Sequence, residues 1–252
     1  MKTTGHTTRV APLAGLLALV VVGATPRAAD DFRPVQSPLP VPPPPGAIVL
    51  FGDGSEGEPK FTAMSGGAID WPVVDGALEV ARTKQAANHI VSTVTFRDAD
   101  IHAEFMVSPE EHGNSGLYIH GHYEMQIYDS FGTDPPTEQD EGSLYRFAPP
   151  LVNAARPAGD WQVYDIRYTA PRRDASGAVI TPGSITAWLN GTKVQDGIEF
   201  TEPRSPYVPY KHGVTEHLRN VEKRLVSTGE GPLFLQDHRS PTRFRNVWIV
   251  PR

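Results

Sequence analysis

The sequence contains no cysteine among its 252 residues. Disulfide bonds and an acylated lipobox cysteine are therefore both excluded, and the fold must be stable without covalent cross-links. The chain also lacks a dense run of basic residues, because 23 Lys and Arg stand against 29 Asp and Glu and give a formal net charge of −6. Such a composition provides no basic field for nucleic acid, so we expect no nucleic-acid partner.

A hydrophobic run long enough to cross a membrane is missing as well. Near the N-terminus, Lys2 and Arg9 precede the apolar stretch from Ala11 to Val22, which small residues follow. This stretch has about twelve residues, whereas a bilayer-spanning helix needs roughly twenty, and it is typical of a signal peptide. We predict a signal peptide over residues 1–29, a secreted or periplasmic location and no membrane span in the mature chain. The alternative is an uncleaved N-terminal anchor.

Proline is abundant in one place only. Residues 34–45, "PVQSPLPVPPPP", hold seven prolines in twelve positions, which favours an extended chain and excludes a regular helix. The sequence therefore predicts a proline-rich linker over residues 30–46 and one folded domain over residues 47–252.

Helical periodicity is weak in this domain and is limited to Gly213–Leu225, whereas a period of two recurs almost throughout. Ile101, Ala103, Phe105 and Val107 alternate with His102, Glu104 and Met106, as in a half-buried strand. "NG" at 190–191 indicates a hairpin turn. We predict an all-β domain, either a two-sheet sandwich or jelly roll, with a barrel as the less favoured alternative.

Alternation also assigns side chains to faces. If Met125 and Ile127 are in the core, Glu124 and Gln126 lie on the opposite, solvent-open face of their sheet. The same rule places Leu233 and Leu235 in the core and Phe234, Gln236 and His238 on the open face, with His102 and Glu104 following from their own strand. Polar side chains on several strands predict a carbohydrate-binding groove. An ordinary solvated sheet face is the alternative.

Four separated motifs carry a resemblance to a known family: "NSGLYIHGHYEMQIYDS", "LYRFAPPLVNAARPAGDWQVYDIRYTAPR", "AWLNGTKVQD" and "LFLQDHRSPTRFRNVWIVP". Their order and features resemble the 3-keto-disaccharide hydrolase family from about Ile48 to Pro251. The resemblance implies a two-sheet concanavalin A-like jelly-roll sandwich that acts on glycosides oxidised to a ketone at sugar carbon 3. The open-face residues that it carries over are Glu124, Gln126, Gln236, Asp237, His238 and Arg245. His120, His122 and Arg239 depart from the family pattern and bear on specificity.

A ketone at carbon 3 acidifies the hydrogen on carbon 2, so a base can remove that proton and the group on carbon 1 can leave by β-elimination, followed by addition of water. We expect Glu124 and His238 to be the catalytic acid and base, in either order. The expected substrate-binding residues are Gln126, Arg245, Gln236, Asp237, Glu104, Tyr118, His120 and Asn114. For Arg245 a structural ion pair is the alternative.

Two rival functions remain open. A laminarinase-like retaining glycosidase would use carboxylates in "EMQIYD", but Gln126 cannot ionise, and Glu124 and Asp129 are five residues apart. Two carboxyls about 5–5.5 Å apart are required for that chemistry. A non-catalytic carbohydrate-binding module would use aromatic side chains such as Tyr118, Phe234 and Trp188.

A metal site has weaker support. His120, His122 and Glu124 resemble a ligand set if they share one face, but Gly121 between the two histidines indicates a turn. Calcium bound by the acidic segment 134–142 is the other possibility, although a solvated acidic loop is favoured there. We assign no cofactor and leave a divalent metal, calcium or a transition metal, as an open alternative.

The long segment from Thr201 to Gly229 is too long for a turn. We expect it to wall one side of the groove and to be dispensable for folding.

Overall fold

The computed structural model describes residues 1–2, 34, 36–52, 57–81, 88–110, 112–201, 208–211 and 214–252. The described residues from Pro34 to Arg252 form one compact unit. The predicted signal peptide lies outside the described residues except for Met1 and Lys2, so secretion stays a prediction. No helix in the described part of the chain is long and apolar enough to cross a membrane.

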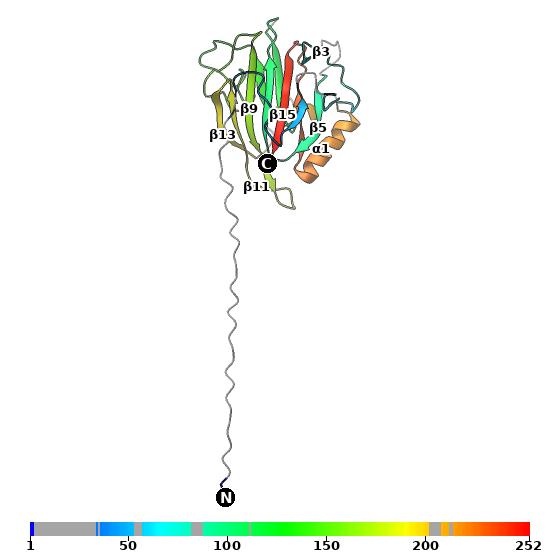
Figure 1. Cartoon of the computed structure of the whole chain (residues 1–252), viewed down its shortest axis with the longest axis vertical. Coiled ribbons are helices and arrows are strands. Elements are labelled where there is room, and N and C mark those ends of the chain that lie inside the picture. The colour runs from blue at the N-terminus through cyan, green and yellow to red at the C-terminus, as the bar shows by residue number, and fades with distance from the viewer. Residues whose placement is uncertain are drawn as a thin grey trace. The chain divides into compact units, whose positions relative to one another are not determined.

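Two antiparallel sheets make up the domain (Figure 1). The large sheet has the order β13-β12-β9-β6-β15-β4-β3, and β1 pairs with β15. Its strands are β1 (Ile48–Phe51), β3 (Val73–Val74), β4 (Ala77–Glu79), β6 (Ala99–Met106), β9 (Trp161–Thr169), β12 (Gly183–Leu189), β13 (Thr192–Phe200) and β15 (Arg243–Pro251).

The small sheet has the order β2-β5-β14-β7-β8. Its strands are β2 (Phe61–Ala63), β5 (Ile90–Phe96), β7 (Asn114–Ile119), β8 (Tyr123–Tyr128) and β14 (Gly231–Leu235), and a separate hairpin joins β10 (Arg172–Arg173) to β11 (Val179–Thr181). The predicted all-β, two-sheet concanavalin A-like jelly-roll sandwich is therefore the observed architecture.

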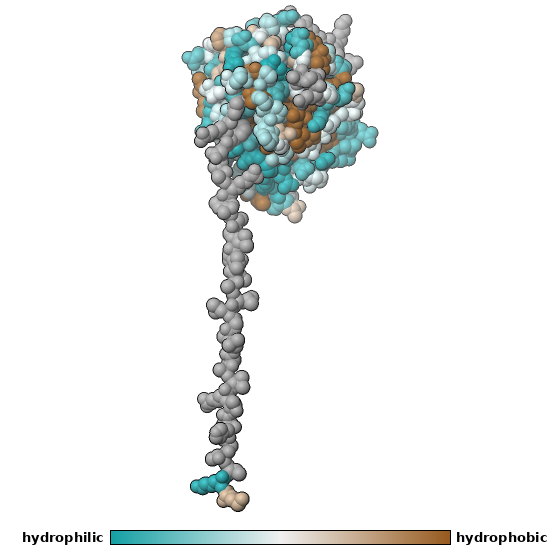
Figure 2. Space-filling view, viewed as in Figure 1, coloured by the Kyte–Doolittle hydropathy of each residue, from teal (hydrophilic) through white to brown (hydrophobic). Residues whose placement is uncertain are grey.

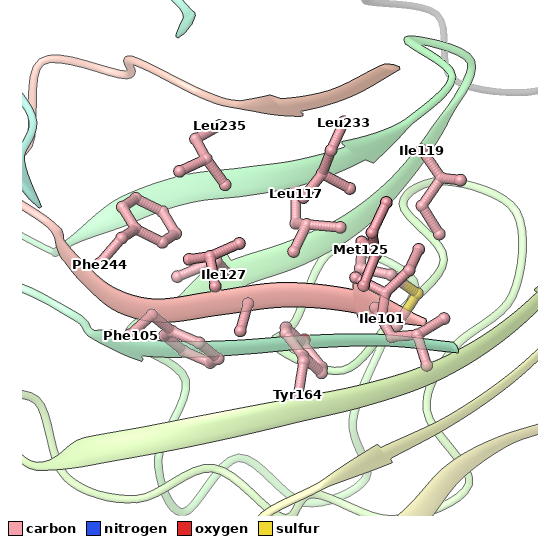
Figure 3. Packing of buried hydrophobic residues seen from close by; sticks show 14 of the residues in the cluster. Ile101, Phe105, Leu117, Ile119, Met125, Ile127, Tyr164, Leu233, Leu235 and Phe244 are labelled. Atoms are coloured by element: carbon pink, nitrogen blue, oxygen red, sulfur yellow. The ribbon is translucent and has the colours of Figure 1, made fainter. Parts of the chain in front are cut away.

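The hydrophobic core lies between the two sheets. Leu117, Ile119, Met125, Ile127, Leu233 and Leu235 of the small sheet pack toward Ile101, Phe105, Tyr164 and Phe244 of the large sheet (Figure 3). The strand alternation in the sequence predicts this interior, because side chains at every second position share a face. On the face seen in Figure 2, hydrophilic residues interrupt the hydrophobic areas, as expected when the larger apolar side chains fill the interior.

One helix, α1 (Glu216–Thr228), covers part of the outer face of the small sheet (Figure 1). The Thr215 side chain caps its first turn by accepting from the Leu218 backbone N–H, and Gly229 ends it with φ 72°. Leu218 and Leu225 join a second apolar cluster with Val91, Tyr118 and Phe234 of the sheet. The short 3-10 helix η1 (Pro209–Lys211) adds Tyr210 to the cluster. The described part of segment 201–229 therefore covers this face of the sheet, as predicted. It also completes a buried apolar cluster, so it is not dispensable for folding as the sequence analysis expects.

The structure differs from the sequence prediction at the proline-rich segment. Residues 36–46, called the strap below, lie against the outer face of the large sheet. The Gln36 side chain donates to Asp165 Oδ2 at 2.8 Å, and the Val41 backbone N–H donates to Glu104 Oε1 at 2.7 Å. The Val41 carbonyl accepts from Asn246 Nδ2 at 2.6 Å. The folded unit begins at Pro34 rather than at residue 47, and the strap is not a free linker.

Candidate functional site

Polar side chains gather on the outer face of the small sheet, beside the area that α1 covers. Glu124 and Gln126 project from β8, Tyr118 from β7, and Gln236 follows directly after β14. Strand pairing sets Tyr118 opposite Glu124 and Gly116 opposite Gln126. We call Tyr118, Glu124, Gln126 and Gln236 the candidate site.

A hydrogen-bond network joins these side chains. Gln236 Nε2 donates to Glu124 Oε1 at 3.1 Å and to the Tyr118 hydroxyl at 2.9 Å. Gln126 Nε2 donates to the Gln139 carbonyl at 3.2 Å. The two amide oxygens, Gln126 Oε1 and Gln236 Oε1, are buried and have no hydrogen-bond partner within the described residues. Since buried polar atoms are nearly always paired in native proteins, these oxygens suit a ligand that donates hydrogen bonds, such as a sugar hydroxyl.

Glu124 and Gln126 are less open than the sequence predicts. They are only 3% and 4% exposed. One cause is the segment 139–145, which extends the sheet past β8: Gln126 N–H donates to the Ser143 carbonyl at 3.1 Å, and Tyr145 N–H donates to the Glu124 carbonyl at 2.9 Å. In the acidic segment 134–142, Asp134 and Glu138 are exposed, as in the solvated loop that the sequence favours, whereas Glu141 is buried and burial raises its pKa well above the ordinary value.

Gly116 makes room for the Glu124 carboxylate. A Cβ atom at position 116 would lie 2.6 Å from Glu124 Oε1 and 3.1 Å from its Cγ. No other residue type fits there unless Glu124 moves. The glycine in "NSGLY" is therefore a part of the site that side-chain chemistry alone does not reveal.

Asp237 has a different role from the substrate binding predicted for it. Its Oδ2 accepts from the Asn88 N–H at 3.1 Å and its Oδ1 from the Arg239 N–H at 2.7 Å. In return, the Asp237 N–H donates to His89 Nδ1 at 3.0 Å. The Asp237 carboxylate thus clamps the segment after β14 to the start of β5, and it brings His89 to the edge of the candidate site.

His238 and Asn114 lie at the same end of the small sheet. His238 is exposed two residues after Gln236, and its catalytic role stays a prediction. Asn114 begins β7, is half-buried, and shares strand parity with Gly116 and Tyr118. Asn114 therefore remains compatible with substrate binding.

Glu104 and Arg245 do not belong to this site. Both lie on the outer face of the large sheet, on the other side of the core, where Arg245 Nε donates to Glu104 Oε2 at 2.8 Å. The Arg245 guanidinium also stacks over Trp161 at 3.8 Å. The structural ion pair, the alternative considered for Arg245, is what the structure shows. Trp188 lies on the same large sheet, so the three aromatic residues considered for a carbohydrate-binding module do not share one face.

The strap and the large sheet enclose this second polar cluster. His102 Nδ1 lies 2.7 Å from Asp165 Oδ1, and its ring stacks on Trp248 at 4.4 Å. Burial opposes the charge on His102, but hydrogen bonds to Asp165 and Glu104 outweigh it and raise its pKa. Burial likewise opposes the charge on Glu104, whose pKa is nevertheless lowered by hydrogen bonds from His102, Asn246 and the Val41 N–H. The cluster holds the strap through charge-assisted hydrogen bonds.

His120 is a core residue rather than a substrate ligand. Its ring packs against Phe96 and Tyr168 at 5.0 and 4.8 Å, and Nδ1 lies 3.1 Å from the Tyr168 hydroxyl. Burial lowers its pKa to about 3. Since Glu124 lies on the outer face, the set His120, His122 and Glu124 does not assemble. No cluster of three or more His, Asp or Glu side chains in the described part of the chain could hold a metal ion.

The fold is an antiparallel jelly-roll sandwich, and one sheet face presents a carboxylate and amide oxygens. Proteins of this class are suited to binding sugars. A family model described as a 3-keto-alpha-glucoside-1,2-lyase-like domain matches residues 46–250. The chain belongs to this family, as its four motifs indicate.

Solved structures agree with this assignment. A crystal structure described as a "putative glycosyl hydrolase" from Parabacteroides distasonis is 30% identical with a TM-score of 0.67, and the match covers 92% of this chain and 98% of that one. A second structure with the same description and organism is 20% identical with a TM-score of 0.54, covering 82% and 94% of the two chains, and supports the fold alone. None of the curated proteins compared matches this chain.

Proposed function

We propose that this protein cleaves glycosides whose sugar carries a ketone at carbon 3, by β-elimination followed by addition of water. Membership of the 3-keto-alpha-glucoside-1,2-lyase-like family supports the substrate class. The observation that carries the proposal to named residues is the juxtaposition of the Glu124 carboxylate with the two unpartnered amide oxygens of Gln126 and Gln236.

Each group has a part in the proposed reaction. Glu124 takes the proton from carbon 2, and the electron pair of the broken C–H bond forms an enolate on the ketone oxygen. The enolate collapses to the enone, and the bond between carbon 1 and the leaving oxygen breaks. His238 provides the proton for that oxygen. Water then adds its hydroxyl to carbon 1 and gives its other proton to His238, while Glu124 returns its proton to carbon 2.

The amide oxygens hold the sugar during this sequence. Gln126 Oε1 and Gln236 Oε1 accept hydrogen bonds from sugar hydroxyls, which supplies the partners that the described residues do not give them. The Gln236 Nε2 bond to Glu124 Oε1 keeps the carboxylate in place without neutralising it. An ordinary retaining glycosidase is less well supported, because two neutral amides flank Glu124 on this face where a second carboxylate would be required.

Substitution of Glu124 by Gln tests the proposal. Glu124→Gln keeps the shape of the side chain and removes its ability to take a proton, so kcat on a 3-keto glycoside should fall by about 10²-fold or more. His238→Ala should cause a comparable loss. Glu199→Gln, on the exposed side of β13, is the matched control and should retain wild-type rates.

The substrate panel should pair each 3-keto glycoside with its unoxidised parent. Selective turnover of the oxidised member is expected. Comparable turnover of both members would contradict the proposal in favour of an ordinary glycosidase, and binding without turnover would favour a carbohydrate-binding module. A folded Glu124→Gln variant with kcat within threefold of wild type would exclude the proton-transfer role.

We also propose that the chain is exported through its N-terminal apolar stretch. N-terminal sequencing of the protein recovered from its native host should give a first residue near Asp30.

A further inference from the structure

A buried cluster of charged side chains lies under the strap, on the outer face of the large sheet. Two of its members bind the strap directly, because Gln36 Nε2 donates to Asp165 Oδ2 and the Val41 backbone N–H donates to Glu104 Oε1. Asp165 and Glu104 are 2% and 0% exposed. We call the four ionisable side chains of this group, which come from three neighbouring strands, the strap cluster: His102 and Glu104 of β6, Asp165 of β9 and Arg245 of β15.

Both ring nitrogens of His102 face carboxylates. Nδ1 lies 2.7 Å from Asp165 Oδ1, and Nε2 lies 3.6 Å from Glu104 Oε1. Asn246 Nδ2 is 3.4 Å from Nε2, but its two hydrogens have shorter bonds, to the Val41 carbonyl at 2.6 Å and to Glu104 Oε1 at 2.8 Å. Among the described residues, neither ring nitrogen therefore has a donor from which to accept. The geometry fits the imidazolium form, which carries a proton on each nitrogen.

The surroundings of His102 stabilise a positive charge on its ring. The ring is stacked on Trp248, with a centroid distance of 4.4 Å and an interplanar angle of 6°, and an aromatic face attracts a cation. Burial by itself lowers the pKa of His102, but the hydrogen bonds to Asp165 and Glu104 outweigh burial and raise the pKa above its ordinary value of 6.5.

The charges of the strap cluster balance only while His102 is protonated. Two cations, His102 and Arg245, then face two carboxylates. Arg245 Nε donates to Glu104 Oε2 at 2.8 Å, so this pair survives when His102 loses its proton. Asp165 then loses the cation beside it while the strap still covers it. A buried carboxylate without a counter-ion is strongly destabilising, and Asp165 gains access to water if the strap leaves.

Other charged side chains on this face are directed to a third carboxylate. Asp100 precedes His102 by two positions on β6 and therefore shares its face. Arg167 Nε, from β9, lies 2.9 Å from Asp100 Oδ1, and Arg252 Nη1, just after β15, lies 3.8 Å from the same oxygen. The groups that raise the pKa of His102 are Asp165 and Glu104, the same two carboxylates that bind the strap.

We propose that His102 is a pH-sensitive switch for the strap: the protonated ring keeps the strap bound to the large sheet, and loss of the proton releases it. The pKa of His102 is higher in the folded protein than in the unfolded chain, so its contribution to binding is complete below about pH 6.5 and is lost as the pH rises through the folded value. We therefore expect a bound strap at acidic and near-neutral pH and a released strap in the alkaline range. The inference is independent of the proposed function, because the candidate site is on the other sheet.

A spin label on the strap tests this inference. The chain has no cysteine, and Ser37 is an exposed strap residue beside Gln36, so a nitroxide on Ser37→Cys reports on the strap alone. Electron paramagnetic resonance distinguishes a restricted label on a bound strap from a mobile label on a released one. In a titration from pH 6 to pH 9.5, the mobile fraction should rise with a midpoint above about pH 6.5. Circular dichroism over the same range shows whether the domain stays folded, and a label that stays restricted throughout in a folded protein would overturn the inference.

Two substitutions in the labelled chain have opposite expected results. His102→Gln removes the cation and keeps both carboxylates, so the label should already be mobile at pH 6. Asp165→Asn removes the carboxylate that would be left without a counter-ion, and Gln36 can turn its amide to pair with the new side-chain amide, so the label should stay restricted up to pH 9.5. Asp196→Asn is the matched control, since it removes an exposed carboxylate of β13, on the same sheet, and should keep the wild-type transition.

The variants also separate His102 from any other titrating group. A transition with the wild-type midpoint in His102→Gln would assign the release to a different group and overturn the inference. If His102→Gln does not fold, Asp165→Asn decides the question, because a wild-type transition in that variant overturns the inference as well. Loss of the transition in Asp165→Asn, together with its retention in Asp196→Asn, supports the switch whether or not the protein cleaves 3-keto glycosides.

Discussion

At the scale of single residues, the candidate site depends on a glycine as much as on its carboxylate. Gly116 and Glu124 are on neighbouring strands, β7 and β8, and the Glu124 side chain lies across the position where a Cβ atom of residue 116 would be. Because Glu124 also accepts from Gln236, its carboxylate has a defined position rather than a choice of rotamers. Catalysis by general bases is sensitive to such placement.

Gly116→Ala should therefore reduce activity without unfolding the protein. The new Cβ would lie 2.6 Å from Glu124 Oε1, so the carboxylate must move, and the atom that moves is the far end of a flexible side chain. We expect kcat/KM on a 3-keto glycoside to fall by more than about tenfold, as misplacement of about 1 Å costs up to 10²-fold. Steady-state kinetics and a thermal melt measure the two effects.

Gly67→Ala is the control for this substitution. Gly67 has only the Ser65 hydroxyl oxygen within reach, at 3.5 Å from an added Cβ, so this variant should keep wild-type kinetics. Unchanged kcat/KM in Gly116→Ala would show that the position of Glu124 is not critical.

Strand parity in the sequence predicts which side chains share a face, but not which sheet or which partner they meet. Parity correctly separates Glu124 and Gln126 from Met125 and Ile127, and Phe234 from Leu233 and Leu235. Glu104 follows the same rule, yet its strand belongs to the other sheet. His89 escapes prediction because its partner, Asp237, is 148 residues away. Such long-range hydrogen bonds leave no periodic signal.

At the scale of structural elements, the strap shows that composition alone does not predict whether a proline-rich segment packs against the domain. Seven prolines prevent regular secondary structure there, but a strap needs only a few backbone and side-chain groups to bind a sheet. The large sheet supplies Glu104, Asp165 and Asn246 for this purpose. β6 is consequently buried on both faces, whereas its alternation predicts a half-buried strand.

Removal of the strap should destabilise the domain. A chain beginning at Ala47 loses the donors from Gln36 and Val41 to two buried carboxylates, and each hydrogen bond to a charged group contributes about 1.5–3 kcal/mol. Compared with a chain beginning at Pro34, we expect the melting temperature to fall by on the order of 10 °C.

The point variant Gln36→Ala isolates one of these contacts in the otherwise complete chain. It should lower the melting temperature by a few degrees. Equal melting temperatures for the chains beginning at Pro34 and Ala47 would return the strap to the role of an inert linker.

Helix α1, on the other side of the sandwich, also contributes to the stability of the fold. It walls the candidate site next to Tyr118, but Leu218 and Leu225 also bury Val91 and Phe234. Deletion of segment 201–229 would expose this cluster, so loss of folding is expected in addition to any change in substrate preference. Specificity at this wall is better tested by substitutions on the helix surface than by deletion.

At the scale of the whole molecule, buried ionisable groups set the pH range over which the fold is stable. Burial lowers the pKa of His120 to about 3 and that of His122 to about 4, so both are neutral in the native protein over most of the acidic range. In the unfolded chain each binds a proton near pH 6.5. Glu141 contributes to stability in the opposite sense. Burial raises the pKa of its carboxyl in the folded protein, so stability is lost as the pH rises above the pKa that this carboxyl has in the unfolded chain.

Comparison of two proteins that differ only at His120 isolates one of these contributions. Between the folded pKa of about 3 and the unfolded value of 6.5, the unfolded state binds one more proton at His120 than the native state does, so stability falls as the pH falls.

His120→Asn tolerates the local φ of 56° and has no titrating ring. Its free energy of unfolding will be lower at pH 7, because the contacts with Phe96 and Tyr168 are lost. The slope of that free energy against pH between 4.5 and 5.5 should decrease by about 1.4 kcal/mol per pH unit relative to wild type, while the Glu141 contribution cancels in the comparison. His112→Asn, at an exposed histidine with φ 47°, is the matched control for the change of side chain. Urea titrations at a series of pH values measure both slopes, and parallel curves for wild type and His120→Asn would show that His120 does not contribute to acid unfolding.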